Sequence, residues 1–255
     1  MYSNTKELLV NAAKGKVEFI QKSLGKYMVA SMWAGAYVGI GIILIMVVGS
    51  ISAAAGSGFT KVFMGLSFGI ALSLVIMAGS ELFTGNNLIM MVGALDKAVT
   101  WKDSIKVWCA SYLGNFIGSF IIGGLFVMTS IQGSPVGEFI INTSSAKMGG
   151  GFAELMAKGI LCNILVCLAV LCSIKLKSES AKLIMIFWCL FAFITAGFEH
   201  SVANMTIFAM GLFMKHPATV SVSGVFANLI PVTIGNFIGG ALMLGASYYF
   251  MGKNK

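Results

Sequence analysis

The sequence predicts an all-α integral membrane protein with six transmembrane helices, arranged as two inverted repeats of three helices whose second and fifth helices are broken. Three observations predict this fold class. The chain of 255 residues is 58% hydrophobic and only 10% charged, whereas soluble domains carry about 25% charged residues. Its lysines cluster in alternate connections. Two of its apolar stretches are too long, and too polar in the middle, for one straight crossing.

The charge of the chain indicates membrane orientation rather than nucleic-acid binding. The net charge of +8 rests on 17 basic residues, all of which are lysine. Proteins that read nucleic acids rely on arginine for bidentate contacts with bases and phosphates, so no nucleic-acid partner is expected. Five cysteines in a chain of this length are also too few for a disulfide scaffold.

The first 26 residues predict a cytoplasmic amphipathic helix. Leu9, Ala13, Val17 and Ile20 recur at helical spacing, and lysines occupy the opposite face. A helix of this kind lies at the membrane surface, where it can pack beneath a bundle of crossings. A gating role is the alternative, and the pattern does not distinguish the two.

Six apolar stretches follow, each long enough to cross the roughly 30 Å hydrocarbon core of a bilayer. They cover residues 27–55, 62–95, 107–130, 153–174, 183–214 and 225–250. Six crossings place thirteen of the seventeen lysines on one side, and the other four are Lys61, Lys147, Lys158 and Lys215. Because lysine-rich connections remain in the cytoplasm, both termini of this multi-pass chain are expected there.

The second and fifth stretches carry an interruption. Each exceeds 30 residues, which would give a straight helix of about 50 Å. Glycines and polar residues occupy their centres, at Gly79–Asn87 and at Gly197–Asn204. Non-helical backbone at membrane depth is tolerated only where protein buries it or where it lines a wet cavity. The alternative is two continuous helices that are tilted and kinked.

A repeated pentapeptide divides the chain into halves. Gly114–Gly118 and Gly235–Gly239 both read Gly-Asn-Phe-Ile-Gly. Residues 27–130 form the first repeat and residues 153–250 the second, and because each has three crossings the two must be inverted relative to one another. Corresponding broken helices in inverted halves are typical of a transport site at the membrane midplane. Residues 1–255 are therefore expected to form a single transmembrane channel domain.

Polar groups at the interruptions make up the candidate site. His200 is the one histidine expected within the membrane, where an ionisable group indicates function; the alternative is a histidine hydrogen-bonded within the bundle. Glu81 and Glu199 are expected to accept backbone N–H groups that the breaks set free. Neutral donors at similar depth, which can also join helices, are Thr84, Asn163 and Asn204. Apolar residues able to form dry constrictions are Leu82, Phe83, Phe68, Phe193 and Val166.

The sequence contains no catalytic motif and no nucleotide-binding loop. Cys162, Cys167 and Cys172 are spaced by five residues, which places successive thiols about 140° apart around a helix. They cannot share a metal-facing side and are expected to be buried thiols. A membrane-embedded enzyme or a redox anchor subunit would need ligands that this pattern lacks, so no enzyme, cofactor or metal site is expected.

Three segments resemble signatures of the formate/nitrite transporter family. They are Glu81–Gly85 in the first break, Gly197–Met205 in the second, and Asn228–Asn236 in the last crossing. The resemblance covers essentially the whole chain. It implies an aquaporin-like fold, assembled as a homopentamer in the inner (cell) membrane of a bacterium, with one pore per protomer. The short connection between Lys215 and Asn228 favours the hydrosulfide-channel branch of the family, of clostridial type.

The resemblance also implies roles for the candidate residues. His200 would be the central pore histidine, with Thr84 facing it and Lys147 as the vestibule lysine. Polar contacts in the pore would come from Asn163 and Asn204, with Glu199 beside them. Leu82 and Phe193 would narrow the cytoplasmic side, and Phe68, Phe83 and Val166 would narrow the outer side.

The expected function is a channel for small monovalent anions of weak acids, with hydrosulfide first and formate and nitrite next. Vestibule lysines would concentrate anions, and half-helix ends would aim N–H groups at them. His200 would donate a hydrogen bond or lend a proton. Proton-coupled transport of formate or nitrite, and an aquaporin-like facilitator of neutral solutes, are the alternatives. The other expected partners are membrane lipid and further copies of the chain.

Overall fold

The structure, a computed structural model, describes residues 2–253, and every regular element in that range is a helix. In chain order these are α1 (Tyr2–Lys22), α2 (Leu24–Ala54), α3 (Thr60–Met77), α4 (Phe83–Leu95), α5 (Trp101–Val127), α6 (Pro135–Met148), α7 (Phe152–Lys175), α8 (Glu179–Ala196), α9 (Ser201–Phe213), α10 (Val222–Phe237), η1 (Ile238–Gly245) and α11 (Ala246–Gly252). The segment η1 is π-helical and joins α10 to α11, so that these three form one continuous rod.

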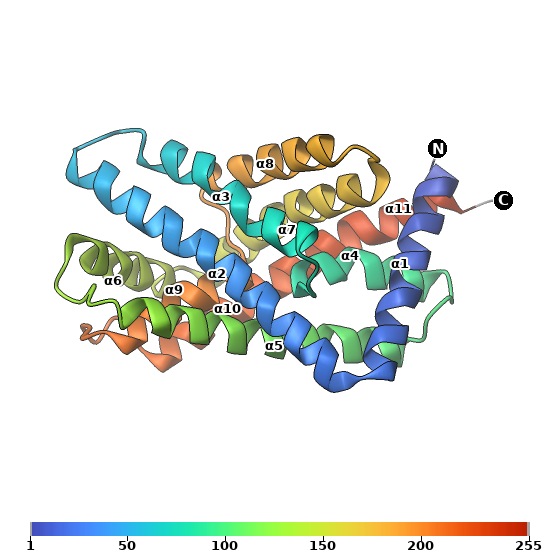
Figure 1. Cartoon of the computed structure of the whole chain (residues 1–255), viewed down its shortest axis with the longest axis horizontal. Helices are drawn as coiled ribbons and strands as arrows, with labels where there is room; N and C mark the ends of the chain where they lie inside the picture. The colour runs from blue at the N-terminus through green and yellow to red at the C-terminus, as the bar shows by residue number, and fades with distance from the viewer. Residues whose placement is uncertain (1, 254–255) are drawn as a thin grey trace.

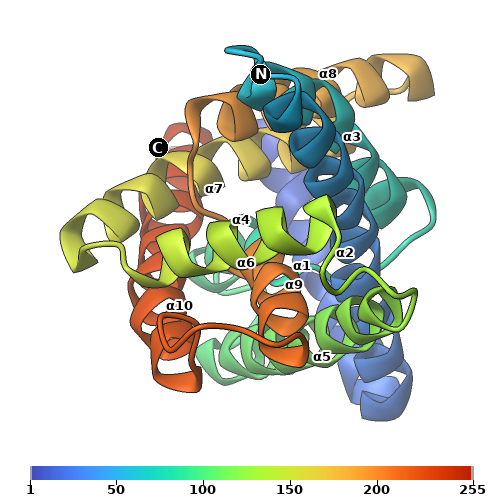
Figure 2. The ribbon, with the colours of Figure 1, turned by 90° about the vertical axis from the view of Figure 1, so that its left-hand side faces the viewer.

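The helices form an elongated bundle with both ends of the chain on one side (Figure 1). We call this side the terminal end and the opposite side the distal end. The α4–α5 and α7–α8 connections lie at the terminal end, and the α2–α3, α5–α6 and α9–α10 connections lie at the distal end. Helix α1 lies across the terminal end, whereas α6 runs across the distal end in front of α9 (Figure 2).

Within residues 2–253, six helical segments are long and apolar enough to cross a membrane: α2, α3, α5, α7, α8 and the α10–α11 rod. The predicted interruptions are real breaks in the backbone. Residues 78–82 separate α3 from the short apolar helix α4, and residues 197–200 separate α8 from the short apolar helix α9. The prediction of six crossings with broken second and fifth helices is confirmed, and continuous kinked helices are excluded.

Residues 131–152 contain a helix, α6, that the sequence does not predict. Ser134 caps it, because its Oγ accepts a hydrogen bond from the Gly137 N–H at 3.2 Å, and Pro135 occupies the first turn, where its missing N–H costs nothing. The buried residues Gly137, Ile140, Ser144 and Met148 recur at helical spacing. The Ser-Pro cap was the available signal, but the segment is too short and too mixed in composition to indicate a crossing.

Glycines allow the crossings within each half to approach closely. A Cβ on Gly118 of α5 would lie 1.8 Å from the Met32 carbonyl oxygen of α2, and one on Gly239 would lie 2.2 Å from the Ile160 carbonyl oxygen of α7. Small residues permit such backbone contact between membrane helices. The repeated pentapeptide therefore marks the same close helix–helix contact in both halves: α5 against α2 in the first half, and the last membrane-spanning rod against α7 in the second.

Helix α1 packs against the bundle through its predicted apolar face. Leu9, Ala13, Val17 and Ile20 are buried, and an ion pair joins Lys6 to Asp96 at the end of α4. The outward face of α1 is polar. The helix therefore covers the terminal end of the bundle and turns its charged face to solvent.

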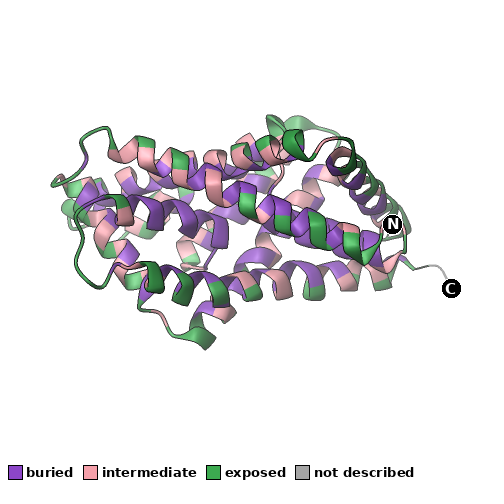
Figure 3. Cartoon of the chain, turned by 90° about the horizontal axis from the view of Figure 1, so that it is seen from below, coloured by how far each residue is buried: buried purple, intermediate pink, exposed green. Residues whose placement is uncertain are grey.

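Burial follows the arrangement expected for a membrane bundle. Buried positions gather on the inner sides of the helices, while exposed positions lie on the outer sides and at the ends (Figure 3). Many of the exposed outer residues are large and apolar, among them Trp33, Leu113, Trp188 and Phe226. A surface of this kind is stable where lipid covers it.

Candidate functional site: a path between two mouths

One asparagine of each repeated pentapeptide forms hydrogen bonds with the backbone at one of the two helix breaks. Asn115 of α5 accepts the Phe83 N–H at 2.9 Å through Oδ1. Its Nδ2 donates to the carbonyl oxygens of Ser31 at 2.7 Å and Glu81 at 2.9 Å. Backbone groups freed at membrane depth must find partners within the protein. This fully buried amide satisfies two of them at the α3–α4 break, and its bond to Ser31 ties the break to α2.

Asn236 performs the same task at the second break. Its Oδ1 accepts the Ser201 N–H at 2.9 Å, and its Nδ2 donates to the carbonyl oxygens of Gly159 at 2.8 Å and Glu199 at 3.0 Å. Every partner of Asn115 thus has a counterpart in the other half. The inverted repeat extends to individual hydrogen bonds.

The half-helices α4 and α9 begin near each other in the middle of the bundle and run toward opposite ends (Figure 1). His200 is the N-cap of α9, and its Nδ1 accepts the Ala203 N–H at 3.1 Å. Its Nε2 lies 2.9 Å from the Thr84 Oγ1 in the first turn of α4. Because Nδ1 is an acceptor, a neutral imidazole carries its hydrogen on Nε2 and donates to the threonine hydroxyl.

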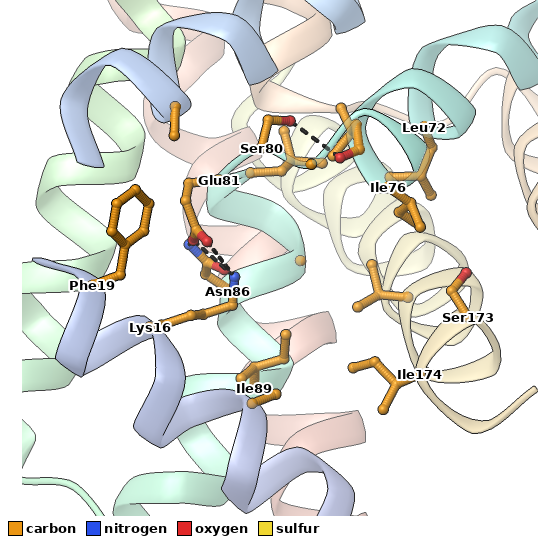
Figure 4. A pocket seen from close by; sticks show the side chains of 17 residues that line it. Lys16, Phe19, Leu72, Ile76, Ser80, Glu81, Asn86, Ile89, Ser173 and Ile174 are labelled. Carbon is orange, nitrogen blue, oxygen red and sulfur yellow. Dashed lines mark hydrogen bonds and ion pairs between the residues drawn. The ribbon is translucent and has the colours of Figure 1, made fainter. Parts of the chain in front are cut away.

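A cavity of about 460 Å³ forms the terminal mouth (Figure 4). The Glu81 carboxylate projects into it from the first break and pairs with Lys16 of α1, whose Nζ lies 2.9 Å from Oε1 and 2.8 Å from Oε2. Oε2 also accepts hydrogen bonds from the Tyr27 hydroxyl at 3.0 Å and the Asn86 Nδ2 at 3.2 Å. Leu82 lines the inner wall of this cavity.

A cavity of about 500 Å³ forms the distal mouth. The Glu199 carboxylate pairs with Lys147 of α6 at 2.7 Å and accepts the Asn204 Nδ2 at 2.6 Å. Asn204 also donates to the Asn228 Oδ1 at 2.8 Å, and Asn228 donates to the Lys147 carbonyl oxygen at 2.8 Å. Each mouth thus carries a glutamate from a break, an asparagine five residues later and a lysine from the helix that covers that end.

A small void lies between the two mouths. Its volume is about 10 Å³, and its lining is Val38, Phe68, Ala71, Leu72, Leu82, Val166, Leu190, Phe193 and His200. Leu82 is shared with the terminal cavity, whereas Phe193 and His200 are shared with the distal cavity. The imidazole is the only ionisable side chain in this lining. The three spaces therefore follow one another through the bundle, with Leu82 between the terminal cavity and the void and with Phe193 and His200 between the void and the distal cavity.

The structure places several constriction residues differently from the roles that the resemblance implies. Leu82 narrows the terminal side, but Phe193 borders the distal cavity, and Phe68 and Val166 line the central void between them. Phe83 lies outside this path. It is the first residue of α4, and its ring packs edge-on against that of Tyr112, with the ring centroids 4.9 Å apart. Both rings line an apolar groove between α5 and α10.

Asn163 lies outside the linings of the three spaces and forms hydrogen bonds with backbone groups next to them. Its Nδ2 donates to the Thr84 carbonyl oxygen at 3.2 Å and to the Asn236 carbonyl oxygen at 2.6 Å. The side chain is fully buried, and none of the three spaces along the path has it in its lining. Asn204, Glu199 and Lys147 line the distal cavity. Thr84 is fully buried and meets the path through its contact with His200.

Sequence reasoning missed part of the site. Lys16, Tyr27 and Asn86 meet Glu81 at the terminal mouth, and Asn115 and Asn236 hold the two breaks. The repeated pentapeptide singled out both asparagines, but spacing alone does not reveal their partners. The match between Glu81–Asn86 and Glu199–Asn204 was the signal for the terminal cluster. Among residues 2–253, no three His, Cys, Asp or Glu side chains gather so that they could hold a metal ion.

The arrangement suits a small anion. Both half-helices direct the positive ends of their dipoles toward the centre, and free N–H groups at helix N-termini attract anions. Each mouth carries a lysine that is mostly, but not wholly, shielded from solvent: 16% of the Lys16 side chain and 21% of the Lys147 side chain are exposed. Each ammonium is therefore within reach of an ion that enters its cavity.

Proteins of known type share this sequence and structure. The sequence model of the formate/nitrite transporter family matches residues 3–250. The nitrite transporter NirC of Escherichia coli (strain K12) is 39% identical over 225 residues, which cover 88% of this chain and 82% of that protein.

Two solved structures extend the likeness to the fold. An FNT family ion channel superimposes with a TM-score of 0.91 at 35% identity, over 97% of this chain and 98% of its own. A pentameric formate channel with formate bound gives a TM-score of 0.79 at 28% identity, over 91% of this chain and 98% of its own. This chain therefore belongs to the formate/nitrite transporter family, whose members are membrane transporters and channels rather than enzymes.

Proposed function

We propose that this chain forms a channel for small monovalent anions of weak acids, with hydrosulfide as the first candidate substrate and formate and nitrite as the others. One observation carries the proposal. The His200 imidazole lines a small void between two cavities, and each of these cavities has a lysine in its lining. The family and its nitrite- and formate-carrying members support the substrate class.

The geometry suggests how such an ion would pass. Lys16 or Lys147 would raise the concentration of anions at the mouth that it lines. Leu82 and Phe193 would exclude ions that keep their hydration shell. In the central void the ion would lose its water, which is costly unless a donor replaces it, and the Nε2–H of His200 is the donor at hand. A neutral imidazole can donate this hydrogen bond but cannot give the proton away, because that would leave an imidazolate anion, so donation alone would let the bare anion cross. The neutral acid would cross if the ring first took up a second proton from water and then passed one proton to the anion, which would return the ring to its neutral form.

The size of the central void supports hydrosulfide as the first candidate. A cavity needs roughly 10–15 Å³ to hold one water molecule, and the void measures about 10 Å³. Hydrosulfide has one heavy atom, whereas formate and nitrite each have three. The larger anions would require Leu82 or Phe193 to move further aside.

The assembly and placement of the chain are part of the same proposal. The pentameric architecture of the related formate channel supports a homopentamer in which residues 1–255 of each copy form one channel domain with its own pore. The lysine-rich terminal end would face the cytoplasm, because positive charge is retained there. The membrane would be the inner (cell) membrane of a bacterium, with lipid covering the apolar outer surface.

A flux assay on purified protein in liposomes tests this function. Hydrosulfide, formate and nitrite gradients are imposed in turn, and glycerol serves as a neutral solute of the kind that aquaporin-like facilitators carry. We expect all three anions to cross much faster than in protein-free liposomes, hydrosulfide fastest, and glycerol at the protein-free rate. Rapid glycerol flux, or anion flux at the protein-free rate, would contradict the proposal. A faster rate for formate or nitrite would reassign the preferred anion.

A further inference from the structure

One buried difference between the two mouths lies at Tyr27. The internal repeat pairs Met28, Ala30 and Ser31 of α2 with Met156, Lys158 and Gly159 of α7. In both halves these positions make the same contacts with the following pentapeptide helix or with the N–H of the glutamate in the break. The same register pairs Tyr27 with Leu155. A hydroxyl therefore stands at the terminal mouth where the distal mouth has an alkyl side chain.

Tyr27 is fully buried and makes its hydrogen bonds at the terminal cluster. Its hydroxyl donates to the Glu81 Oε2 at 3.0 Å and accepts from the Asn86 Nδ2 at 3.2 Å. Its ring also packs against Phe19 of α1, with ring centroids 5.5 Å apart. The residue thus connects the helix that carries Lys16 with the break that carries Glu81.

The extra hydroxyl changes how the glutamate charge is shared. The Glu81 carboxylate accepts from Lys16, Tyr27 and Asn86. Among the described residues, the Glu199 carboxylate accepts side-chain hydrogen bonds from Lys147 and Asn204 alone. Hydrogen bonds to a charged group are stronger than those between neutral groups. A carboxylate that accepts a further hydrogen bond holds its lysine less strongly. The ammonium group of that lysine is then more readily available to bind another anion.

We propose that Tyr27 is a positioning residue of the terminal mouth: its hydroxyl holds the Glu81 carboxylate so that Lys16 is available to an incoming anion, and it makes capture stronger at this mouth than a leucine would. This inference rests on the proposed function, since it assigns part of the same path. It predicts an effect on one side of the membrane only, because the distal mouth has no contact with Tyr27.

The test is Tyr27→Phe, measured from each side. Everted and right-side-out vesicles from the same expressing bacteria present opposite ends of the channel to the medium, and sodium formate and sodium hydrosulfide serve as probes. We expect the half-saturating concentration at the terminal end to rise roughly tenfold, which is the loss of one hydrogen bond to a charged group. The value at the distal end is expected to stay unchanged. Equal changes at both ends, or no change at either, would overturn the proposal.

Tyr112→Phe is the matched control. It also removes a tyrosine hydroxyl, here a partly buried one, that bonds to the Thr233 Oγ1 at 3.0 Å in the groove between α5 and α10, away from both mouths. The half-saturating concentrations of this variant, measured from each side, are expected to equal those of the wild type. Tyr27→Leu places at the terminal mouth the residue of the distal mouth, and the same one-sided rise is expected. If both Tyr27 variants fail to accumulate while the Tyr112 variant does, Tyr27 serves packing alone and the proposal is wrong.

Infrared spectroscopy separates this proposal from the function of the channel. The carboxylate stretch of Glu81 is assigned in protein with ¹³C-labelled glutamate, as the band that Glu81→Gln removes. Tyr27→Phe is expected to shift this band, and Tyr112→Phe is expected to leave it in place. This measurement needs no transport, so a chain that carries none of the anions would still test the hydrogen bond. An unshifted band would overturn the role of Tyr27, whatever the flux results.

Discussion

At the scale of the residue, the site depends on how a few polar side chains are paired inside an apolar protein. His200 accepts a backbone N–H with one ring nitrogen and meets Thr84 with the other. Both ring nitrogens therefore have a partner before any anion arrives, and the imidazole is oriented by the start of α9 rather than by a second ionisable group. An oriented neutral donor adapts to an anion at low cost, because its position is already fixed.

The histidine is expected to control the pH dependence of transport. His200→Asn keeps a polar side chain at the centre but removes the titratable ring, so the variation of formate flux between pH 5 and 8 should flatten relative to the wild type. The measurement is initial flux into liposomes across that range. His216→Asn is the matched control, because His216 is exposed in the α9–α10 connection. A wild-type profile in the His200 variant would remove this ring from the mechanism.

Which of these residues the sequence reveals depends on where their partners lie. A lone histidine beside glycines in an apolar stretch is visible without a structure, and so are Glu81 and Glu199. The partners are not visible, because Thr84 is 116 positions from His200 and Lys16 is 65 positions from Glu81. Such distances reflect the packing of whole helices, which periodicity does not report.

At the scale of the element, hydropathy and length predict the crossings well and the short helices poorly. The breaks in the second and fifth crossings follow from simple excess length, because a bilayer accommodates only about 20 helical residues. Helix α6 has no such constraint. Its fourteen residues are mixed in polarity, and only its position across the distal end shows that it matches α1 at the other end (Figures 1 and 2). The predicted repeats of 27–130 and 153–250 therefore omit the helix that precedes each of them.

The helix crossing between α2 and α5 is expected to tolerate no side chain at Gly118. An added Cβ would lie 1.8 Å from the Met32 carbonyl oxygen, and a backbone atom cannot move aside without separating the helices. Gly118→Ala should lower the midpoint of thermal unfolding in detergent by several degrees or prevent accumulation, since overpacking costs about 1–3 kcal/mol or more.

Gly15→Ala provides the control for that substitution. Gly15 lies in α1 with no atom within 4 Å of an added Cβ, and alanine favours a helix over glycine by about 1 kcal/mol. The midpoint for this variant should be equal to or above that of the wild type. If Gly118→Ala behaves in the same way as Gly15→Ala, the close α2–α5 contact is not needed for stability.

At the scale of the whole molecule, an inverted repeat makes the two ends chemically alike. Each end has a covering helix, a lysine, a glutamate at a break and an asparagine five residues later. The repeat was visible in the sequence from one pentapeptide and an odd number of crossings per half. The likeness of the mouths was not, because Lys16 and Lys147 lie in no shared motif.

The orientation of the molecule in the membrane can be tested through its exposed lysines. Lys14 and Lys22 belong to α1, which lies across the terminal end, and Lys215 belongs to the α9–α10 connection at the distal end; all three are exposed. An amine reagent that does not cross membranes should modify Lys14 and Lys22 in everted vesicles, and Lys215 in right-side-out vesicles, as read by peptide mass spectrometry. The reverse pattern would place the termini outside and contradict the lysine rule for this chain.

The origin of the two ammonium groups has a practical consequence. Lys16 and Lys147 come from α1 and α6, which lie on the ends of the bundle and are not part of any crossing. Substitutions on the solvent-facing sides of either peripheral helix can therefore change the attraction toward ions from one solution while the buried faces that pack on the bundle stay as they are. The preferences of the two faces can diverge independently, by natural variation or by engineering, while the narrow centre stays as it is.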